Sequence, residues 1–212
     1  MIRTPAAGPQ PSIAGIRLRA DARRRPEPTA RRRGAVRVVP AAEAWAALAA
    51  DPALPDDELV VVGDAIARRA GDLRTLSVVT GLSRGRRGGA RMRAALARVR
   101  TRVDSPQETR TRLLVVAAGI PEPEVDLDVH AEDGSGWLFR PDLRWLRPKV
   151  ALEYDGLHHV RSDRRRRDIA RRELADRHGW RLVVATAPDL TTYRRRLVAR
   201  VEDALRDRGM TW

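Results

Sequence analysis

The 212-residue chain contains no cysteine. This absence excludes disulfide bonds, catalytic thiolates and cysteine-based zinc sites, so any metal ion has to be held by Asp, Glu or His side chains. Long apolar runs are also absent: stretches such as LLVVAAGI at residues 113–120 fall well short of the ~18 residues that a membrane span requires. The N-terminal MIRTPAAGPQPS lacks the apolar centre of a secretory signal peptide. We therefore expect a cytoplasmic protein with no membrane partner.

Lysine is nearly absent as well, because Lys149 is the single lysine among 42 basic residues. With 28 acidic residues the formal net charge is +14, which favours a polyanionic partner such as nucleic acid. The chain is also rich in Ala, Gly and Pro, so part of this arginine excess reflects a GC-rich genome. Net charge falls from +8 in residues 1–40 to +4 in residues 41–103 and +2 in residues 104–212. An acidic cluster in the C-terminal half is therefore not outweighed by arginine.

The chain divides into three segments. Residues 1–34 contain GPQPS and RRRPEPTARRR and little that could be buried, which indicates a disordered Arg/Pro-rich tail. Residues 35–103 form an expected small helical region, in which four segments have helical spacing. These segments are AAEAWAALAA at 41–50, PDDELVVVGDAIARRA at 55–70, DLRTLSVVTG at 72–81 and GGARMRAALARVRTRV at 88–103. Residues 104–212 carry the clearest pattern.

The C-terminal segment predicts the element order α-β-β-β-α-β with a closing helix. Ser105 is the expected N-cap of the first helix, with Pro106 at its first position and Gly119 as its terminator. The second helix starts at Ser162 and ends at His178, and Ile169, Ala170 and Leu174 give it one buried face. The predicted strands are EVDLDVHA at 124–131, GWLFRPDLRW at 136–145, KVALEYDG at 149–156 and WRLVVAT at 180–186, and the last helix is TTYRRRLVARVEDALRDRG at 191–209. The fold class is therefore α/β, of the α+β type.

Acidic side chains converge in the hairpin that turns at Arg147 and Pro148. Glu153 and Asp155 share one face of their strand, and Asp142 lies across from Leu152 or Glu153. Like charges on neighbouring strands are destabilising unless a cation lies between them. Mg²⁺, or Mn²⁺ in its place, prefers such oxygen ligands and usually takes only one or two protein carboxylates. A bound Mg²⁺ would activate water and stabilise charge on a phosphodiester.

Pro141-Asp142 paired with Glu153-Tyr154-Asp155, in this order of elements, resembles the PD-(D/E)XK nuclease superfamily. More narrowly, EYDGLHH, the helix carrying Asp168 and Arg171, and GWRLVV resemble a bacterial domain of unknown function related to very-short-patch-repair endonucleases. The resemblance covers about residues 104–190. The preceding segment is similar to the middle part of actinobacterial proteins in which this domain follows a winged-helix region like that of abortive-infection, or type IV, antitoxins. The resemblance implies a restriction-endonuclease-like core and a Mg²⁺-dependent endonuclease acting on DNA.

The resemblance also implies roles for single residues. Asp142 and Glu153 match the metal ligands, and Glu108 matches the acid on the first helix that supports the site through water. Asp155 stands where the superfamily pattern has lysine; we expect it to orient water or metal together with Glu108, and the general base stays open. Lys149 is an unsuitable substitute because ~13 Å of strand separates it from Glu153. His159 is the better candidate for a base or a phosphate contact.

One further departure from the family pattern and one set of arginines complete the expected site. Val184 occupies a position in the last strand where the narrower family often has arginine. The arginines expected to neutralise phosphate near the cleft are Arg161, Arg164, Arg167 and Arg171.

Simpler interpretations of the same residues remain open. Glu108 also fits a capping box, Asp142 could start a turn, Asp155-Gly156 is a common turn dipeptide, and arginine runs are often solvated faces. A second hypothesis is a non-catalytic nucleic-acid-binding protein or type IV antitoxin-like transcriptional regulator, which the missing lysine and Val184 favour. A third is a structural domain whose acids are solvated. No pattern in the sequence indicates an oligomeric state.

Overall fold

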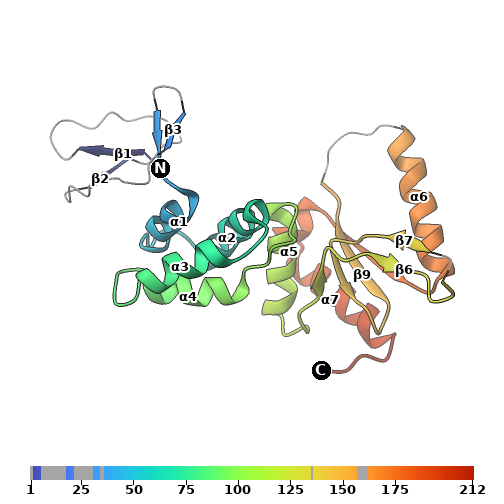
Figure 1. Cartoon of the computed structure of the whole chain (residues 1–212). Coiled ribbons are helices and arrows are strands. Elements are labelled where there is room, and N and C mark those ends of the chain that lie inside the picture. Colours follow the sequence, from blue (N-terminus) through green and yellow to red (C-terminus); the bar gives the residue numbers. More distant parts are fainter. Residues whose placement is uncertain (1, 6–17, 22–30, 34–35, 135, 157–161) are drawn as a thin grey trace.

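A computed structural model of the chain describes residues 2–5, 18–21, 31–33, 36–134, 136–156 and 162–212. These residues contain seven α-helices and a small mixed sheet, an α+β arrangement (Figure 1). The helices are α1 (Ala41–Ala49), α2 (Asp56–Ala70), α3 (Arg74–Leu82), α4 (Gly89–Arg98), α5 (Pro106–Ala117), α6 (Ser162–Arg177) and α7 (Arg194–Arg206), with a short 3-10 helix η1 at Ala187–Leu190. Within the described residues, no helix is both long enough and apolar enough to span a membrane.

Helices α1 to α4 form the region that the sequence predicts to be helical. Pro55 precedes α2, three acids occupy its first turn, and Gly71 ends it with a φ of 76°, in the left-handed region that glycine tolerates best. Trp45 is fully buried at the centre of this region and donates its indole N–H to the carbonyl oxygen of Leu59 at 2.8 Å. The four predicted helices are present, although α4 ends at Arg98 and not at Val103 as the arginine-rich pattern predicts.

The described residues of the N-terminal segment include short paired strands, and the disordered Arg/Pro-rich tail at residues 1–34 stays a prediction. Two pairs of short strands lie there: β1 (Ile2–Pro5) is parallel to β2 (Leu18–Asp21), and β3 (Arg31–Arg33) is antiparallel to β4 (Val36–Val38). Strands pair through their backbone groups, so an arginine-rich composition does not prevent pairing. The other residues of the tail lie outside the described part of the chain.

The main sheet has the strand order β10-β9-β8-β5. Its members are β5 (Glu124–Val125), β8 (Leu143–Trp145), β9 (Val150–Tyr154) and β10 (Arg181–Ala185). Strand β10 is parallel to β9, whereas β8 is antiparallel to both of its neighbours, β9 and β5. The β8–β9 hairpin pairs Trp145 with Val150 and Leu143 with Leu152, and Lys149 adopts a φ of 54° in its turn. The hairpin register predicted from the sequence is confirmed.

The two preceding strands are each broken, contrary to the sequence prediction. Residues 124–131 divide into β5 and β6 (Val129–His130), and residues 136–145 divide into β7 (Trp137–Phe139) and β8; β6 and β7 pair in a ribbon of their own. Pro141 has no N–H to donate to a ladder, which explains the break between β7 and β8. Asp126, with a φ of 46°, donates its N–H to the carbonyl oxygen of Asp142 at 3.0 Å and marks the other break.

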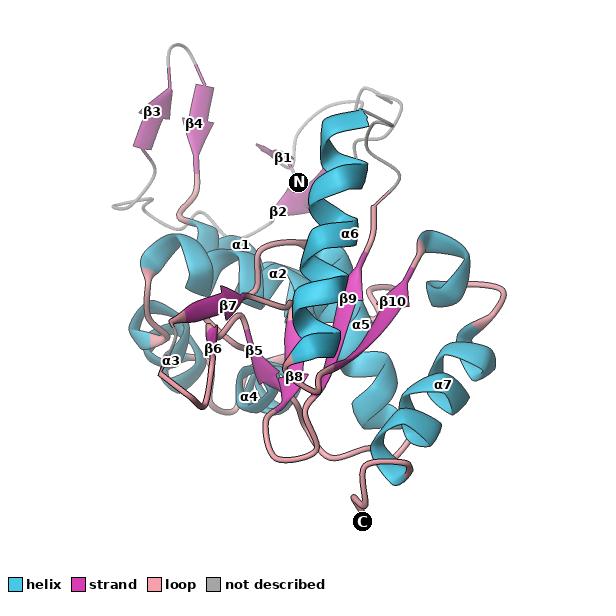
Figure 2. Cartoon of the chain, turned by 90° about the vertical axis from the view of Figure 1, so that its right-hand side faces the viewer, coloured by secondary structure: helices cyan, strands magenta, loops and turns pink. Residues whose placement is uncertain are grey.

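Helices cover both faces of the sheet (Figure 2). On one face, Val150 and Leu152 pack with Val115 of α5 and Leu197 of α7. On the other face, Ala151 packs with Ala175 of α6, and nearby the rings of Phe139 and Trp180 meet edge to face at 5.6 Å. Alternate residues of β9 therefore face α5 and α6.

The buried face of α6 differs from the predicted one. Ile169 is 49% exposed and Ala170 is exposed, whereas the predicted Leu174 is partly buried against the core and Ala175 is fully buried. Only the later turns of α6 lie over the sheet, because its first turns extend past the ends of β9 and β10 (Figure 2). Helical spacing alone does not show where along its length a helix meets the sheet.

Candidate functional site

Three elements bring the predicted carboxylates together. Asp142 directly precedes β8, Glu153 is the fourth residue of β9, and Glu108 lies in the first turn of α5. The pairing of Leu143 with Leu152 places Asp142 beside Glu153 at the next position of the hairpin. Glu108 and Glu153 are buried, with 8% and 7% of their surfaces exposed, which is unusual for carboxylates.

Asp142 is the most perturbed of the three acids. Its Oδ2 accepts a hydrogen bond from the backbone N–H of Tyr154 at 2.7 Å. Burial is the main cause that raises the pKa of Asp142, and the charges of Glu108 and Glu153 add to the rise, whereas the Tyr154 N–H and Arg171 oppose it; the resulting pKa is about 7. The raised pKa of Asp142 therefore reflects burial first, with a smaller contribution from the charges of the two other carboxyl groups.

Glu108 has a structural role as well. The Ser105 side chain accepts a hydrogen bond from the backbone N–H of Glu108 at 3.2 Å. Ser105 is therefore the N-cap of α5, as predicted. Glu108 Oε2 accepts the N–H of Asp104 at 2.8 Å, one residue before the cap rather than at the cap itself. Burial raises the pKa of Glu108. Glu108 thus fixes the start of α5 while it lies near Asp142.

Glu153 is paired with an arginine of α6. Arg171 Nη2 lies 2.8 Å from Glu153 Oε2, and the Arg171 side chain is 37% exposed. The sequence predicts a phosphate contact for Arg171 and does not predict this ion pair. A signal for it was present: Arg171 precedes Leu174 and Ala175 by three and four residues, which puts it on the face of α6 that meets the sheet.

The other predicted residues are placed less centrally. Asp155 follows the end of β9, and its side chain is exposed, so strand alternation does not carry it into the buried cluster with Glu153. Lys149 lies at the opposite end of β9, where its Nζ is 2.9 Å from Glu132 Oε2. Val184 pairs with Glu153 in the β9–β10 register. His159 and Arg161 lie outside the described residues, and only the backbone of α6 is described at Arg164 and Arg167.

The chemistry of these donors fits a hard divalent cation. Asp142 and Glu153 offer carboxylate oxygens, and the mutual repulsion seen in the pKa of Asp142 is what a bound cation would offset. Among the described residues, no group of three or more His, Asp or Glu side chains is arranged to hold a metal ion. A carboxylate pair is nevertheless the usual protein contribution to a Mg²⁺ site.

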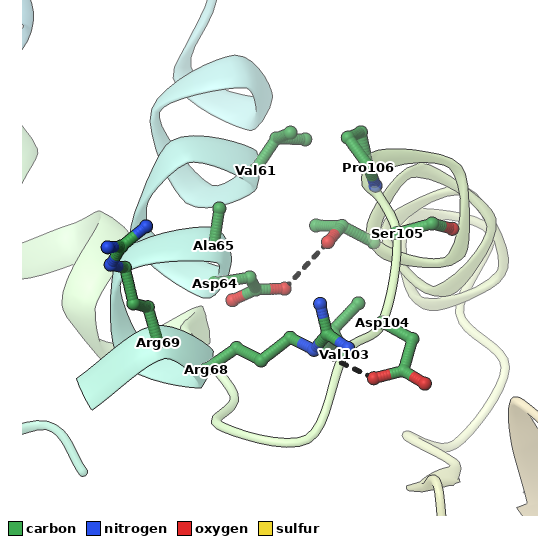
Figure 3. Close-up of a pocket in the computed structure, with 10 residues that line it drawn as sticks. Val61, Asp64, Ala65, Arg68, Arg69, Val103, Asp104, Ser105 and Pro106 are labelled. Carbon is green, nitrogen blue, oxygen red and sulfur yellow. Dashed lines mark hydrogen bonds and ion pairs between the residues drawn. The ribbon is translucent and has the colours of Figure 1, made fainter. Parts of the chain in front are cut away.

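A pocket lies on the other side of the start of α5 (Figure 3). Its volume is about 470 Å³, and its walls come from α2 and from the segment that leads into α5. Inside the pocket, the Thr109 hydroxyl donates a hydrogen bond to Asp64 Oδ2 at 2.8 Å. Near the rim, Arg68 pairs with Asp104 at 2.8 Å. The start of α5 therefore contacts the helical region through Thr109 and the carboxylate cluster through Glu108.

Comparisons with known proteins give relatives but no family. No family model matches the chain, and no solved structure matches it. The chain is similar to the uncharacterized proteins MT2308 and Rv2248 from two strains of Mycobacterium tuberculosis, with 31% identity over 119 residues in each case. The match covers 56% of this chain and 43% of each relative, so it spans less than half the length of those proteins.

Proposed function

We propose that the protein is a divalent-metal-dependent endonuclease that hydrolyses phosphodiester bonds in DNA. The observation that carries this proposal is the meeting of Asp142, Glu153 and Glu108 from three separate elements, with a pKa of about 7 at Asp142. Groups with strongly perturbed pKa values are concentrated at functional sites. The sequence resemblance to PD-(D/E)XK nucleases supports the same assignment. The helix-covered mixed sheet is consistent with a restriction-endonuclease-like core. A nuclease acting on DNA would work in the cytoplasm.

Asp142 and Glu153 would hold Mg²⁺ or Mn²⁺, which supplies charge neutralisation and an activated water when it is bound. The backbone N–H of Tyr154 orients the Asp142 carboxylate. Glu108, fixed by the N–H of Asp104, keeps a further carboxyl group beside Asp142. Arg171 pairs with Glu153, and with a divalent cation bound at Glu153 its guanidinium would be available for a phosphate oxygen.

Cleavage of supercoiled plasmid tests the proposal. We expect nicking with Mg²⁺ or Mn²⁺ and none with a chelator. Asp142→Asn and Glu153→Gln each lower the rate by roughly 100-fold or more, because several kcal/mol of transition-state stabilisation would be lost. Glu132→Gln is the matched control, since it removes one negative charge from an exposed side chain outside the cluster. Equal products from the wild type and both cluster variants would overturn the nuclease assignment.

A second candidate function is a non-catalytic nucleic-acid-binding or type IV antitoxin-like regulator. The observations that favour it are the Glu153–Arg171 ion pair, which already neutralises one metal ligand, and the exposed Asp155 at the usual lysine position. In this case the protein binds DNA with an affinity that falls as salt rises, and no condition yields nicked plasmid. A neighbouring gene for a nucleotidyltransferase-like toxin would support the antitoxin class.

A further inference from the structure

Trp137 is an exposed aromatic ring held in one orientation. It is the first residue of β7, and 59% of its surface is exposed although the next two residues, Leu138 and Phe139, are buried. Its indole N–H donates to Asp128 Oδ1 at 2.7 Å. A tryptophan fixed at its edge with its surface open to solvent has a large apolar face available for contact.

Arg140 fixes the same carboxylate from the other side. Its Nε lies 3.0 Å from Asp128 Oδ1 and its Nη2 lies 2.8 Å from Oδ2, so the two groups meet through two hydrogen bonds. Hydrogen bonds from Arg140 and then from Trp137 lower the pKa of Asp128 to about 2. The arrangement of Trp137, Asp128 and Arg140 therefore persists at neutral pH.

The ribbon that carries Trp137 leads directly to the carboxylate cluster. His130, which is exposed, pairs with Trp137 across the ribbon. Arg140 Nε lies 3.7 Å from Asp126 Oδ1, and Asp126 donates its N–H to the carbonyl oxygen of Asp142 at 3.0 Å. Trp137 is thus connected to the first carboxylate of the candidate site by a short chain of contacts.

Single exposed apolar residues are ordinary on protein surfaces. Tyr193, 51% exposed at the start of α7, is an example within this chain. Trp137 differs in two respects: a carboxylate–arginine pair fixes its orientation, and a cationic side chain and a histidine lie beside it. Aromatic rings beside cationic groups are the surfaces on which unpaired bases stack.

We propose that Trp137 is a stacking contact for an unpaired nucleobase, with Asp128 and Arg140 as positioning residues, so that the protein prefers single-stranded or unpaired nucleic acid. The inference rests on the proposed function, because it assigns a substrate class to the same site. The bases of a duplex are stacked on one another, and a ring on an open surface cannot reach their faces without unstacking them. A single strand offers each base face directly.

Fluorescence anisotropy with a labelled single strand of thymidines and a labelled hairpin duplex tests the proposal. The measurement is made in chelator at constant salt, so that binding is read without cleavage. We expect Trp137→Ala to weaken single-strand binding about ten-fold, since one base stack is lost, and to change duplex binding by less than about two-fold. Trp137→Phe keeps an aromatic face and retains most of the affinity. Tyr193→Ala is the matched control and leaves both affinities unchanged.

Three results would overturn the stacking assignment: no binding of the single strand by the wild type, binding by Trp137→Ala within about two-fold of the wild type, or an equal loss for duplex and single strand. Thermal unfolding of Trp137→Ala excludes a folding defect as the cause of a loss. Plasmid nicking by Asp142→Asn is measured separately. Unchanged nicking would refute the nuclease proposal while leaving the anisotropy result to decide on Trp137.

Discussion

At the residue scale, Asp142 is expected to make stability depend on pH. Its pKa in the folded protein is about 7, above the ordinary value of 3.8, so the folded state binds the proton more tightly than the unfolded state. This contribution is fully present below about pH 4 and is lost as the pH rises to about 7. Ionising Asp142 in the folded protein therefore costs on the order of 4 kcal/mol more than in the unfolded chain.

Asp142→Asn removes that ionisation while keeping an oxygen for the Tyr154 N–H. In chelator, we expect the variant to be more stable than the wild type by a few kcal/mol at pH 8 and nearly equal to it at pH 4. Urea unfolding at the two pH values measures the difference. Asp176→Asn, an exposed carboxylate of α6, is the control and should leave the pH profile unchanged. An Asp142→Asn profile that parallels the wild type would contradict the pKa assigned to Asp142.

Arg171 gives a second prediction at the residue scale. Arg171→Gln removes the ion pair with the buried Glu153 carboxylate and should lower the free energy of unfolding in chelator by ~2 kcal/mol, less than for a fully buried pair because Arg171 is 37% exposed. Added Mn²⁺ should restore this loss, since a cation at Glu153 replaces the guanidinium.

Thermal unfolding with and without Mn²⁺ measures both effects, and Arg172→Gln, the exposed neighbour on α6, is the control. If Mn²⁺ raises the melting temperature of Arg171→Gln no more than that of the wild type, Glu153 does not bind the metal.

The sequence predicts some residue positions and not others for identifiable reasons. The proximity of Asp142 and Glu153 follows from strand alternation and the short turn, because a tight hairpin fixes its register. The ion pair of Glu153 with Arg171 joins residues from different elements across the sheet face. Such a contact depends on how α6 is placed over β9, which local spacing does not encode.

At the element scale, helices were predicted better than strands. The cap at Ser105 and the left-handed Gly71 are local signals, so the limits of α5 and α2 could be read from the sequence. The strands expected at 124–131 and 136–145 are each divided between two sheets. The alternation of apolar and polar residues continues through each break, so this pattern does not indicate where the strands divide. Pro141 does indicate the break between β7 and β8.

Helix α6 shows a related limit of what helical spacing predicts. Its arginine-rich first turns extend past the sheet, and the apolar Ile169 is exposed there. An apolar residue at helical spacing is buried only where a partner surface exists. The same extension leaves the first part of α6 uncovered by the sheet, next to the end of β9 that carries Glu153.

At the scale of the whole molecule, α5 belongs to two cores. Leu113 packs into the core of the helical region, whereas Val115 packs against the sheet. The expected domain boundary lies between residues 103 and 104. Helix α5, on the C-terminal side of this boundary, therefore packs into the cores of both segments. A helix with apolar contacts on two sides couples the folding of both.

A buried ion pair strengthens this coupling and supplies the prediction for the whole molecule. Arg112 of α5 is 1% exposed, and its Nη2 lies 3.2 Å from Oδ2 of Asp64 in α2. Burial raises the pKa of Asp64, although Arg112 and the N–H of Arg100 oppose the rise. Arg112 also pairs with Glu122 at 2.9 Å, so removing Asp64 takes away one of its two carboxylate partners, at a cost of about 3 kcal/mol.

Asp64→Ala should therefore remove much of the ~5–15 kcal/mol that stabilises a typical domain. The loss should appear in one transition of the entire chain, because both cores meet at α5. Urea unfolding followed by tryptophan fluorescence and by far-ultraviolet circular dichroism measures it. Glu58→Ala is the matched control, since Glu58 pairs with Arg110 between the same two helices at the surface and should cost under about 1 kcal/mol. Two separate transitions, with only the first shifted by Asp64→Ala, would show that the helical region folds independently of the sheet.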